Sequence, residues 1–169
     1  MKTSFSNVIA LWVLPGLIAG ILFLVIALIS GALATTVWAM PEGIAHVTGI
    51  AAPANYSFAL VPVLVGITIH LALSIVLGII FTAFVQWRHL HGWLLILAAA
   101  IFVSIETPIA LWVVMHPLLP ASTFSFFLSA IPWWGSVLGH YVYALTLGLL
   151  LMLNPFTASW KPQQPLAAR

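Results

Sequence analysis

Three ionisable side chains of this sequence fall inside long apolar segments, and they are His70, Glu106 and His140. An ionisable group in hydrocarbon is costly, so such residues normally pair, face a cavity or bind a ligand. Two imidazoles and one carboxylate can hold Zn²⁺ or Fe²⁺ with an open coordination position. The candidate metal ligands are therefore Glu106, His70 and His140.

The two imidazoles also suggest cofactors other than a single metal ion. His70 and His140 could bind one haem b from opposite faces, if small residues beside them leave room for the macrocycle. One imidazole beside small residues could instead bind the Mg²⁺ of a chlorophyll-type pigment. The candidate cofactor-binding residues are therefore His70 and His140.

Two further interpretations of the same three residues stay open. A neutral His–Glu–His hydrogen-bond network, with Tyr143 and Ser136 nearby, would hold the helices in register without any ligand. A proton or ion path would use Glu106, where Pro108 removes a backbone hydrogen bond and loosens the helix. The sequence contains no HExxH, P-loop or nucleophile motif, so we favour a non-enzymatic role.

The composition places these residues in a membrane protein. Of the 169 residues, 64% are hydrophobic and 4% are charged, whereas soluble domains carry roughly 25% charged residues. So few charges cannot cover a water-soluble globule, which excludes a soluble domain and a nucleic-acid binder. The chain has no cysteine, which excludes disulfides and thiolate metal sites. The first partner expected is the lipid bilayer.

Four apolar segments are long enough to cross a hydrocarbon core roughly 30 Å thick. They are residues 8–39, 60–86, 92–115 and 132–153. We expect an all-α fold, an integral membrane four-helix bundle with antiparallel hairpins, as a single domain over residues 1–169 with a flexible tail at 161–169. The short connection at 88–91 predicts a tight hairpin between the second and third spans.

The basic residues predict the orientation of these spans. All four lie on one side of the predicted membrane, and the two longer connections, 40–59 and 116–131, contain none; the four are Lys2, Arg88, Lys161 and Arg169. The positive-inside rule makes that side cytoplasmic, so both termini are expected in the cytoplasm and the protein in the cell inner membrane. The three buried ionisable residues then lie roughly 10–15 Å below the outer surface. The longer connections are apolar, and we expect them in the interface or against a partner.

Small residues indicate where the helices meet. Membrane helices associate through small residues that allow close backbone approach. In the second span Gly66, His70, Ser74, Gly78 and Thr82 recur at every fourth position, which places them on one stripe facing protein or cofactor. The candidate helix-packing residues are Gly16, Gly20, Gly66, Ser74, Gly78, Gly135 and Gly139.

The order of two motifs resembles a known group of proteins. The second span reads H-L-A-L-S-I-V-L-G from His70, and the fourth contains G-H-Y-V-Y from Gly139. This order is similar to that of small bacterial inner-membrane proteins of the uncharacterised YagU-like type, over about the last two-thirds of the chain. The resemblance implies a four-helix inner-membrane protein and supplies no activity. Members tend to carry a His in the third span, where this chain has Glu106.

A thin bundle without a soluble domain has no visible energy source of its own. We therefore expect a non-catalytic multi-pass subunit or accessory protein of a larger bacterial membrane complex for respiratory or photosynthetic electron transfer. Its partners would be other membrane subunits or further copies of itself, and its candidate cofactors are a haem b, a chlorophyll-type pigment or a divalent metal. The alternatives are a small oligomeric transporter of an ion, a proton or a solute, with Glu106 in the path, and an integral membrane metalloenzyme.

Overall fold

The computed structural model describes residues 9–154, which are helical except for short connections. Four long α-helices form the body, and they are α2 (Leu14–Ala34), α4 (Leu60–Arg88), α5 (Leu94–Pro108) and α8 (Trp133–Leu153). Two π-helical segments adjoin them: η1 (Ile9–Val13) precedes α2, and η2 (Ile109–Met115) with α6 (His116–Leu118) continues α5. Two shorter helices, α3 (Ala39–Val47) and α7 (Ala121–Ala130), lie in the connections. The tail predicted at 161–169 lies outside the described residues.

Four helical segments are long and apolar enough to cross a membrane. Their bounds are Leu11–Ala34, Leu60–Arg88, Leu94–Leu118 and Trp133–Leu153. A helix satisfies its own backbone hydrogen bonds, which is what a span in hydrocarbon requires. The prediction of an all-α fold with four long apolar helices is confirmed, and the protein is a multi-pass membrane protein. The first span ends at Ala34, five residues earlier than predicted, and α3 follows as a separate helix.

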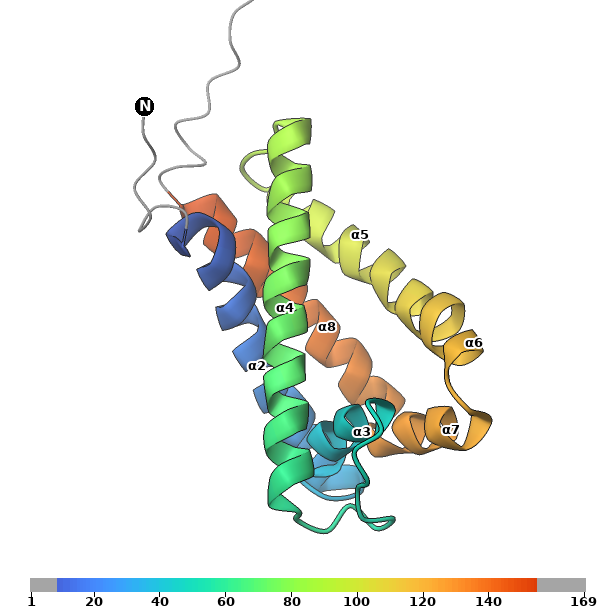
Figure 1. Cartoon of the computed structure of the whole chain (residues 1–169). Coiled ribbons are helices and arrows are strands. Elements are labelled where there is room, and N and C mark those ends of the chain that lie inside the picture. The colour runs from blue at the N-terminus through green and yellow to red at the C-terminus, as the bar shows by residue number, and fades with distance from the viewer. Residues whose placement is uncertain (1–8, 155–169) are drawn as a thin grey trace, which may run out of the picture.

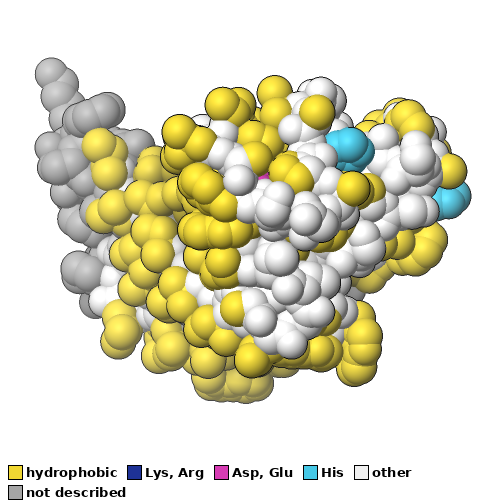
Figure 2. Space-filling view, turned by 90° about the horizontal axis from the view of Figure 1, so that it is seen from below, with side chains coloured by type: hydrophobic (Ala, Val, Ile, Leu, Met, Phe, Trp, Pro, Cys, Tyr) yellow, Lys and Arg dark blue, Asp and Glu magenta, His cyan; other side chains and the backbone are white. Residues whose placement is uncertain are grey.

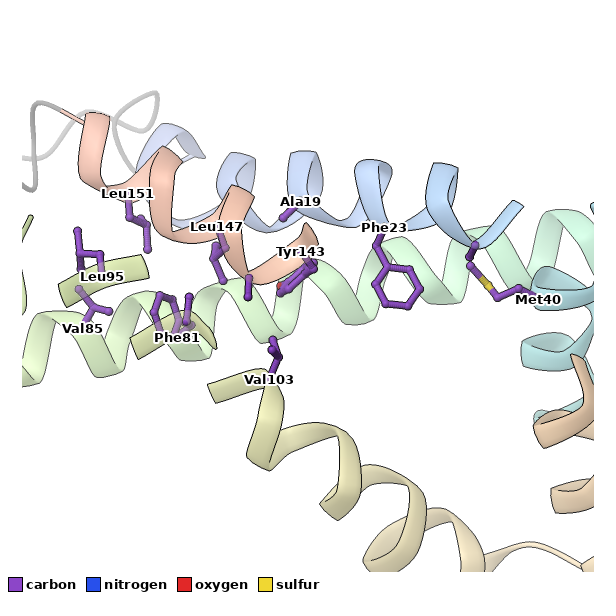
Figure 3. Close-up of a cluster of buried hydrophobic side chains, with 13 residues drawn as sticks. Ala19, Phe23, Met40, Phe81, Val85, Leu95, Val103, Tyr143, Leu147 and Leu151 are labelled. Carbon is purple, nitrogen blue, oxygen red and sulfur yellow. The ribbon is translucent and has the colours of Figure 1, made fainter. Parts of the chain in front are cut away.

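Helix α2 packs against both α4 and α8, and α5 packs against α8 (Figure 1). The largest cluster of buried apolar side chains lies between these helices (Figure 3). It includes Ala19, Phe23, Phe81, Leu95, Val103, Tyr143, Leu147 and Leu151. The core is therefore shared by all four spans.

The tight hairpin predicted for the second and third spans is wrong. After the turn at residues 89–93, α5 diverges from α4 and makes few contacts with it (Figure 1). The reason is the packing of α5 on α8: a Cβ added to Gly148 would lie 2.7 Å from the Cα of Ile96. Because α5 approaches α8 so closely, it leans away from its neighbour in the sequence.

The two longer connections fold onto each other at one end of the bundle. Helix α3 packs on α4 and on α7, and we call residues 35–59 together with 119–132 the cap. The hydroxyl of Tyr56 donates a hydrogen bond to the carbonyl of Phe126 at 2.6 Å and lies 2.8 Å from Oγ of Ser129. Figure 2 views this end of the described structure, where hydrophobic side chains lie among backbone and uncharged polar side chains and no Lys or Arg is visible. Part of the apolar surface of these two connections is therefore buried where they pack on each other.

The five-residue stripe of α4 faces protein, since all five of its members are buried. A Cβ on Gly78 would lie 2.6 Å from the Cα of Gly16, and one on Gly20 would lie 2.5 Å from the Cβ of Ser74. A Cβ on Gly66 would overlap the carbonyl of Pro41 in α3. The two glycines of this stripe carry no side chain, which lets α2 approach α4 at Gly78 and α3 approach it at Gly66.

We expect Gly78→Ala to destabilise the protein by about 1–3 kcal/mol, because the added methyl group forces the backbones of α2 and α4 apart. The measurement is unfolding in detergent, followed by circular dichroism. Ala83→Val, on the exposed side of the same helix, is the control and should change stability by less than about 0.5 kcal/mol. Equal stability of the Gly78 variant and the wild type would contradict the close-approach interpretation.

Candidate functional site

His70 lies on the buried stripe of α4, where α2 crosses it. Its Nε2 is 3.0 Å from the carbonyl oxygen of Gly20, and since a carbonyl can only accept, Nε2–H is the donor. One turn further along, Oγ of Ser74 donates to the carbonyl of His70 at 2.8 Å. The hydroxyl of Tyr143, from α8, donates to the carbonyl of Ser74 at 2.7 Å. These bonds tie α2, α4 and α8 together around His70.

His140 lies on α8 and also binds the backbone rather than another ionisable side chain. Its Nδ1 is 2.7 Å from the carbonyl oxygen of Ser136, one turn earlier, so Nδ1–H is the donor. Oγ of Ser136 is 3.5 Å from the same nitrogen, at the limit of a hydrogen bond. The bond fixes the imidazole against its own helix.

Phe23 of α2 contacts both imidazoles. Its ring centroid is 4.9 Å from that of His70 and 4.8 Å from that of His140. A Cβ on Gly139 would lie 3.1 Å from the Phe23 ring, so this ring already fills the room that Gly139 leaves. A haem between the two imidazoles needs that room, and the residues present therefore do not fit the predicted bis-histidine haem. The chlorophyll-type alternative, which needs one imidazole, stays a prediction.

Glu106 lies two residues before the end of α5 and is partly exposed. Its Oε2 accepts a hydrogen bond from Oγ1 of Thr107 at 3.3 Å. It is close enough to His140 and to Tyr143 for electrostatic interaction, and His140 is likewise within range of His70. The structure thus brings the three predicted residues near one another, but no hydrogen bond of the described structure joins them into the alternative His–Glu–His network.

Within residues 9–154, no group of three or more His, Cys, Asp or Glu side chains is placed to hold a metal ion. Glu106, His70 and His140 therefore do not form the three-ligand metal centre that the sequence suggested. The imidazole of His70 is held by the Gly20 carbonyl of α2, whereas that of His140 is held by the Ser136 carbonyl of its own helix, so the two imidazoles are fixed to different helices.

The divergence of α4 and α5 leaves an open groove of about 660 Å³. Among the described residues, 9–154, Glu106 is the only charged one that lines it. Every other lining residue is apolar, and they include Leu77, Ile80 and Phe84 of α4, Ile101, Phe102 and Ile105 of α5, and Ile109, Ala110 and Val114 of η2. Sequence reasoning identified Glu106 but missed the groove, since the groove results from the way α5 leans on α8.

Glu42 of α3 is a buried acid that sequence reasoning also missed. Its side chain is 0% exposed, and its Oε1 accepts a hydrogen bond from the backbone N–H of Ala59 at 3.0 Å. Ala59 is the N-cap of α4, where the helix dipole favours a negative charge. The other oxygen, Oε2, and Nδ1 of His46 are buried without a hydrogen-bond partner among the described residues. Glu42 therefore connects the cap to the start of α4.

The sequence offered one signal for this burial. Pro41-Glu42-Gly43 is typical of a solvated turn, yet this acid stands in a connection that is otherwise almost entirely uncharged and largely apolar.

Burial raises the pKa of the Glu42 carboxyl above its ordinary value of 4.5, an effect that the hydrogen bond from Ala59 partly offsets by lowering it. Burial also raises the pKa of Tyr56; the hydrogen bond with Ser129 lowers it, and the nearby charge of Glu42 raises it further. Glu42 and Tyr56 are therefore within electrostatic range of each other.

No protein family, curated protein or solved structure matches the chain. The resemblance to YagU-like proteins stays a prediction, and the site is interpreted from its own geometry.

We expect Glu42→Gln to remove a pH dependence of stability. Because the folded-state pKa is raised, the stabilising contribution of Glu42 is complete below about pH 4.5 and is lost as the pH rises through the folded-state pKa. The Gln side chain of the variant keeps an oxygen that accepts the hydrogen bond from the backbone N–H of Ala59, but it cannot titrate. Thermal unfolding in detergent from pH 4 to 8 should show a decline for the wild type and a flatter profile for the variant.

The matched control for this experiment is Thr48→Ala, an exposed polar residue at the end of α3. It should keep the pH profile of the wild type. A Glu42→Gln profile that declines as steeply as that of the wild type would contradict the assignment.

Proposed function

We propose that the chain is a non-catalytic, multi-pass subunit or accessory protein of a larger membrane complex. The observation that carries this proposal is the η2 segment, none of whose seven residues is buried. Its main contacts are with α5 and α6, the helices that continue it along the chain. The third span is therefore the one that its own bundle covers least.

The π-helical geometry of η2 strengthens the proposal. A π-helix has an irregular hydrogen-bond ladder, is rare, and occurs frequently at functional sites. In this chain it follows Pro108, which cannot donate a backbone hydrogen bond. Trp112 and Val113, which do not line the groove, are 59% and 66% exposed. This exposed side of η2 is where we expect a helix of a neighbouring protein to pack.

Crosslinking tests this proposal directly, since the natural chain has no cysteine. We expect Val113→Cys to give one discrete crosslinked product with another protein in membranes of the source cells. Native mass spectrometry of the complex, extracted in mild detergent, should show a fixed stoichiometry.

The control is Ile29→Cys, an exposed residue at a comparable distance from the end of α2, which should give no such product. Equal crosslinking at both positions, or none at Val113, would reject the subunit proposal. A product that contains only two copies of this chain would replace it with self-association.

We further propose that both termini lie in the cytoplasm and that the cap faces the outside of the cell membrane. Arg88 ends α4 at the end of the bundle where α2 starts and α8 finishes, opposite the cap (Figure 1). The cap contains no Lys or Arg. This uneven distribution of basic residues supports the proposed orientation, because basic residues are more frequent on the cytoplasmic side of a membrane protein.

Single cysteines also test the orientation. Asn55→Cys, exposed in the cap, should react with a membrane-impermeant maleimide in intact cells. His91→Cys, exposed in the turn between α4 and α5, should react only after the cells are opened. The opposite pattern would invert the topology.

A further inference from the structure

We propose that the groove between α4 and α5 binds an acyl chain of an anionic phospholipid whose headgroup phosphate pairs with Arg88. The proposal goes beyond a subunit role, because it concerns a lipid rather than a protein partner. It also uses a different surface, the groove and the turn at its end, and not the side of η2 on which Trp112 and Val113 lie.

The groove has the length and the lining that a hydrocarbon chain requires. Its lining residues run along α5 from Ala98 and along η2 to Val114, which is roughly 20 Å by the rise of a helix. One leaflet of a hydrocarbon core about 30 Å thick is shorter than this. Almost all of the surface that the groove exposes is apolar, so Glu106 contributes little to it. Ile101 and Ile105 are about half exposed, so the groove opens sideways and a lipid chain can enter it from the bilayer.

One end of the groove reaches the turn that carries Arg88. Leu90, two residues further along the chain, lines the groove. The guanidinium of Arg88 lies over the ring of Trp87, 5.3 Å from its centroid, and the centroids of the Trp87 and Phe84 rings are 6.3 Å apart. Phe84 itself lines the groove. Two contacts through the ring of Trp87 therefore connect Arg88 to the end of the groove.

The charges at this end select an anion. Arg88 is the only Lys or Arg in residues 9–154, and the sequence has two acidic side chains, Glu42 and Glu106. Glu42 lies in the cap, at the opposite end of the bundle (Figure 1). Glu106 lies twelve residues into α5, roughly 18 Å from the start of that helix. Neither carboxylate is placed to pair with the guanidinium, whereas a phosphate is an anion that Arg binds well.

The exposed aromatic residues place this turn at the level of the lipid headgroups. Trp87 and Trp93, which flank it, are 72% and 68% exposed. Indole rings of membrane proteins gather at the interface between headgroups and hydrocarbon. A phosphate at the turn and an acyl chain in the groove are then two parts of one molecule. This continuity favours a phospholipid over a free anion.

A lipid chain fits the groove better than a protein helix does. Membrane helices pack through small residues, and the close-contact glycines of the spans face other parts of this chain, as Gly78 does against Gly16. The groove is lined mainly by Ile, Leu and Phe. A flexible hydrocarbon chain can follow such large side chains, whereas a helix needs small ones for close approach.

The test compares phosphatidylglycerol with phosphatidylcholine, both carrying two oleoyl chains, so that only the headgroup differs. Native mass spectrometry of the purified, delipidated full chain in detergent measures the binding of the first lipid. We expect the wild type to bind phosphatidylglycerol at least about fivefold more tightly, the effect of one basic residue near an anionic lipid. Arg88→Gln should lose that factor for phosphatidylglycerol and leave phosphatidylcholine unchanged, and Arg88→Lys should retain most of it.

Two further variants locate the acyl chain. Ile101→Trp should fill the groove and abolish the tight binding of phosphatidylglycerol, whereas Ile29→Trp, on the exposed side of α2, should leave it unchanged. Circular dichroism and thermal unfolding confirm that each variant is folded.

Every contrary outcome is distinct. Equal affinity of the wild type for the two lipids, or full phosphatidylglycerol binding by Arg88→Gln, would overturn the proposal. Full binding by Ile101→Trp would also overturn it, by placing the lipid outside the groove. A dimer that excludes lipid and is broken by Ile101→Trp would assign the groove to a second copy of the chain instead. All arms use the isolated chain, so they do not depend on the subunit proposal.

Discussion

The close approach of the α2 and α4 backbones is the contact on which the rest of the bundle depends. In lipid, apolar side chains gain little by leaving one apolar surface for another, so helices are held by close packing and hydrogen bonds. The glycines at 16 and 78 leave so little space that any side chain would separate the helices. That approach lets His70 reach the Gly20 carbonyl and lets Ser74 face α2 without a gap.

Polar groups inside the bundle are used to join helices. The imidazole of His70, the hydroxyl of Ser74 and the hydroxyl of Tyr143 each donate to a backbone carbonyl, two of them across a helix boundary. Each of these donor groups is therefore satisfied within the protein. Glu106 differs because it is partly exposed and lies beside the groove between α4 and α5.

The cap shows how apolar connections can be accommodated without a partner. Tyr56 joins two segments about seventy residues apart through its hydroxyl, and its ring lies 4.6 Å from that of Phe126, measured between centroids. Glu42 fastens the same region to the start of α4. The burial of this acid raises the pKa of its carboxyl above the ordinary value.

The sequence by itself determined the membrane location, the four spans and the buried stripe of α4, because apolar length and four-residue spacing are local properties that no packing can alter. It also singled out Glu106 as an unusual residue. Only the tertiary structure decided that Phe23 fills the space between the two imidazoles, that α5 leans on α8 and leaves a groove beside Glu106, and that Glu42 is buried. These features depend on which helices touch, and spacing along one helix carries no information about the angle at which another helix crosses it.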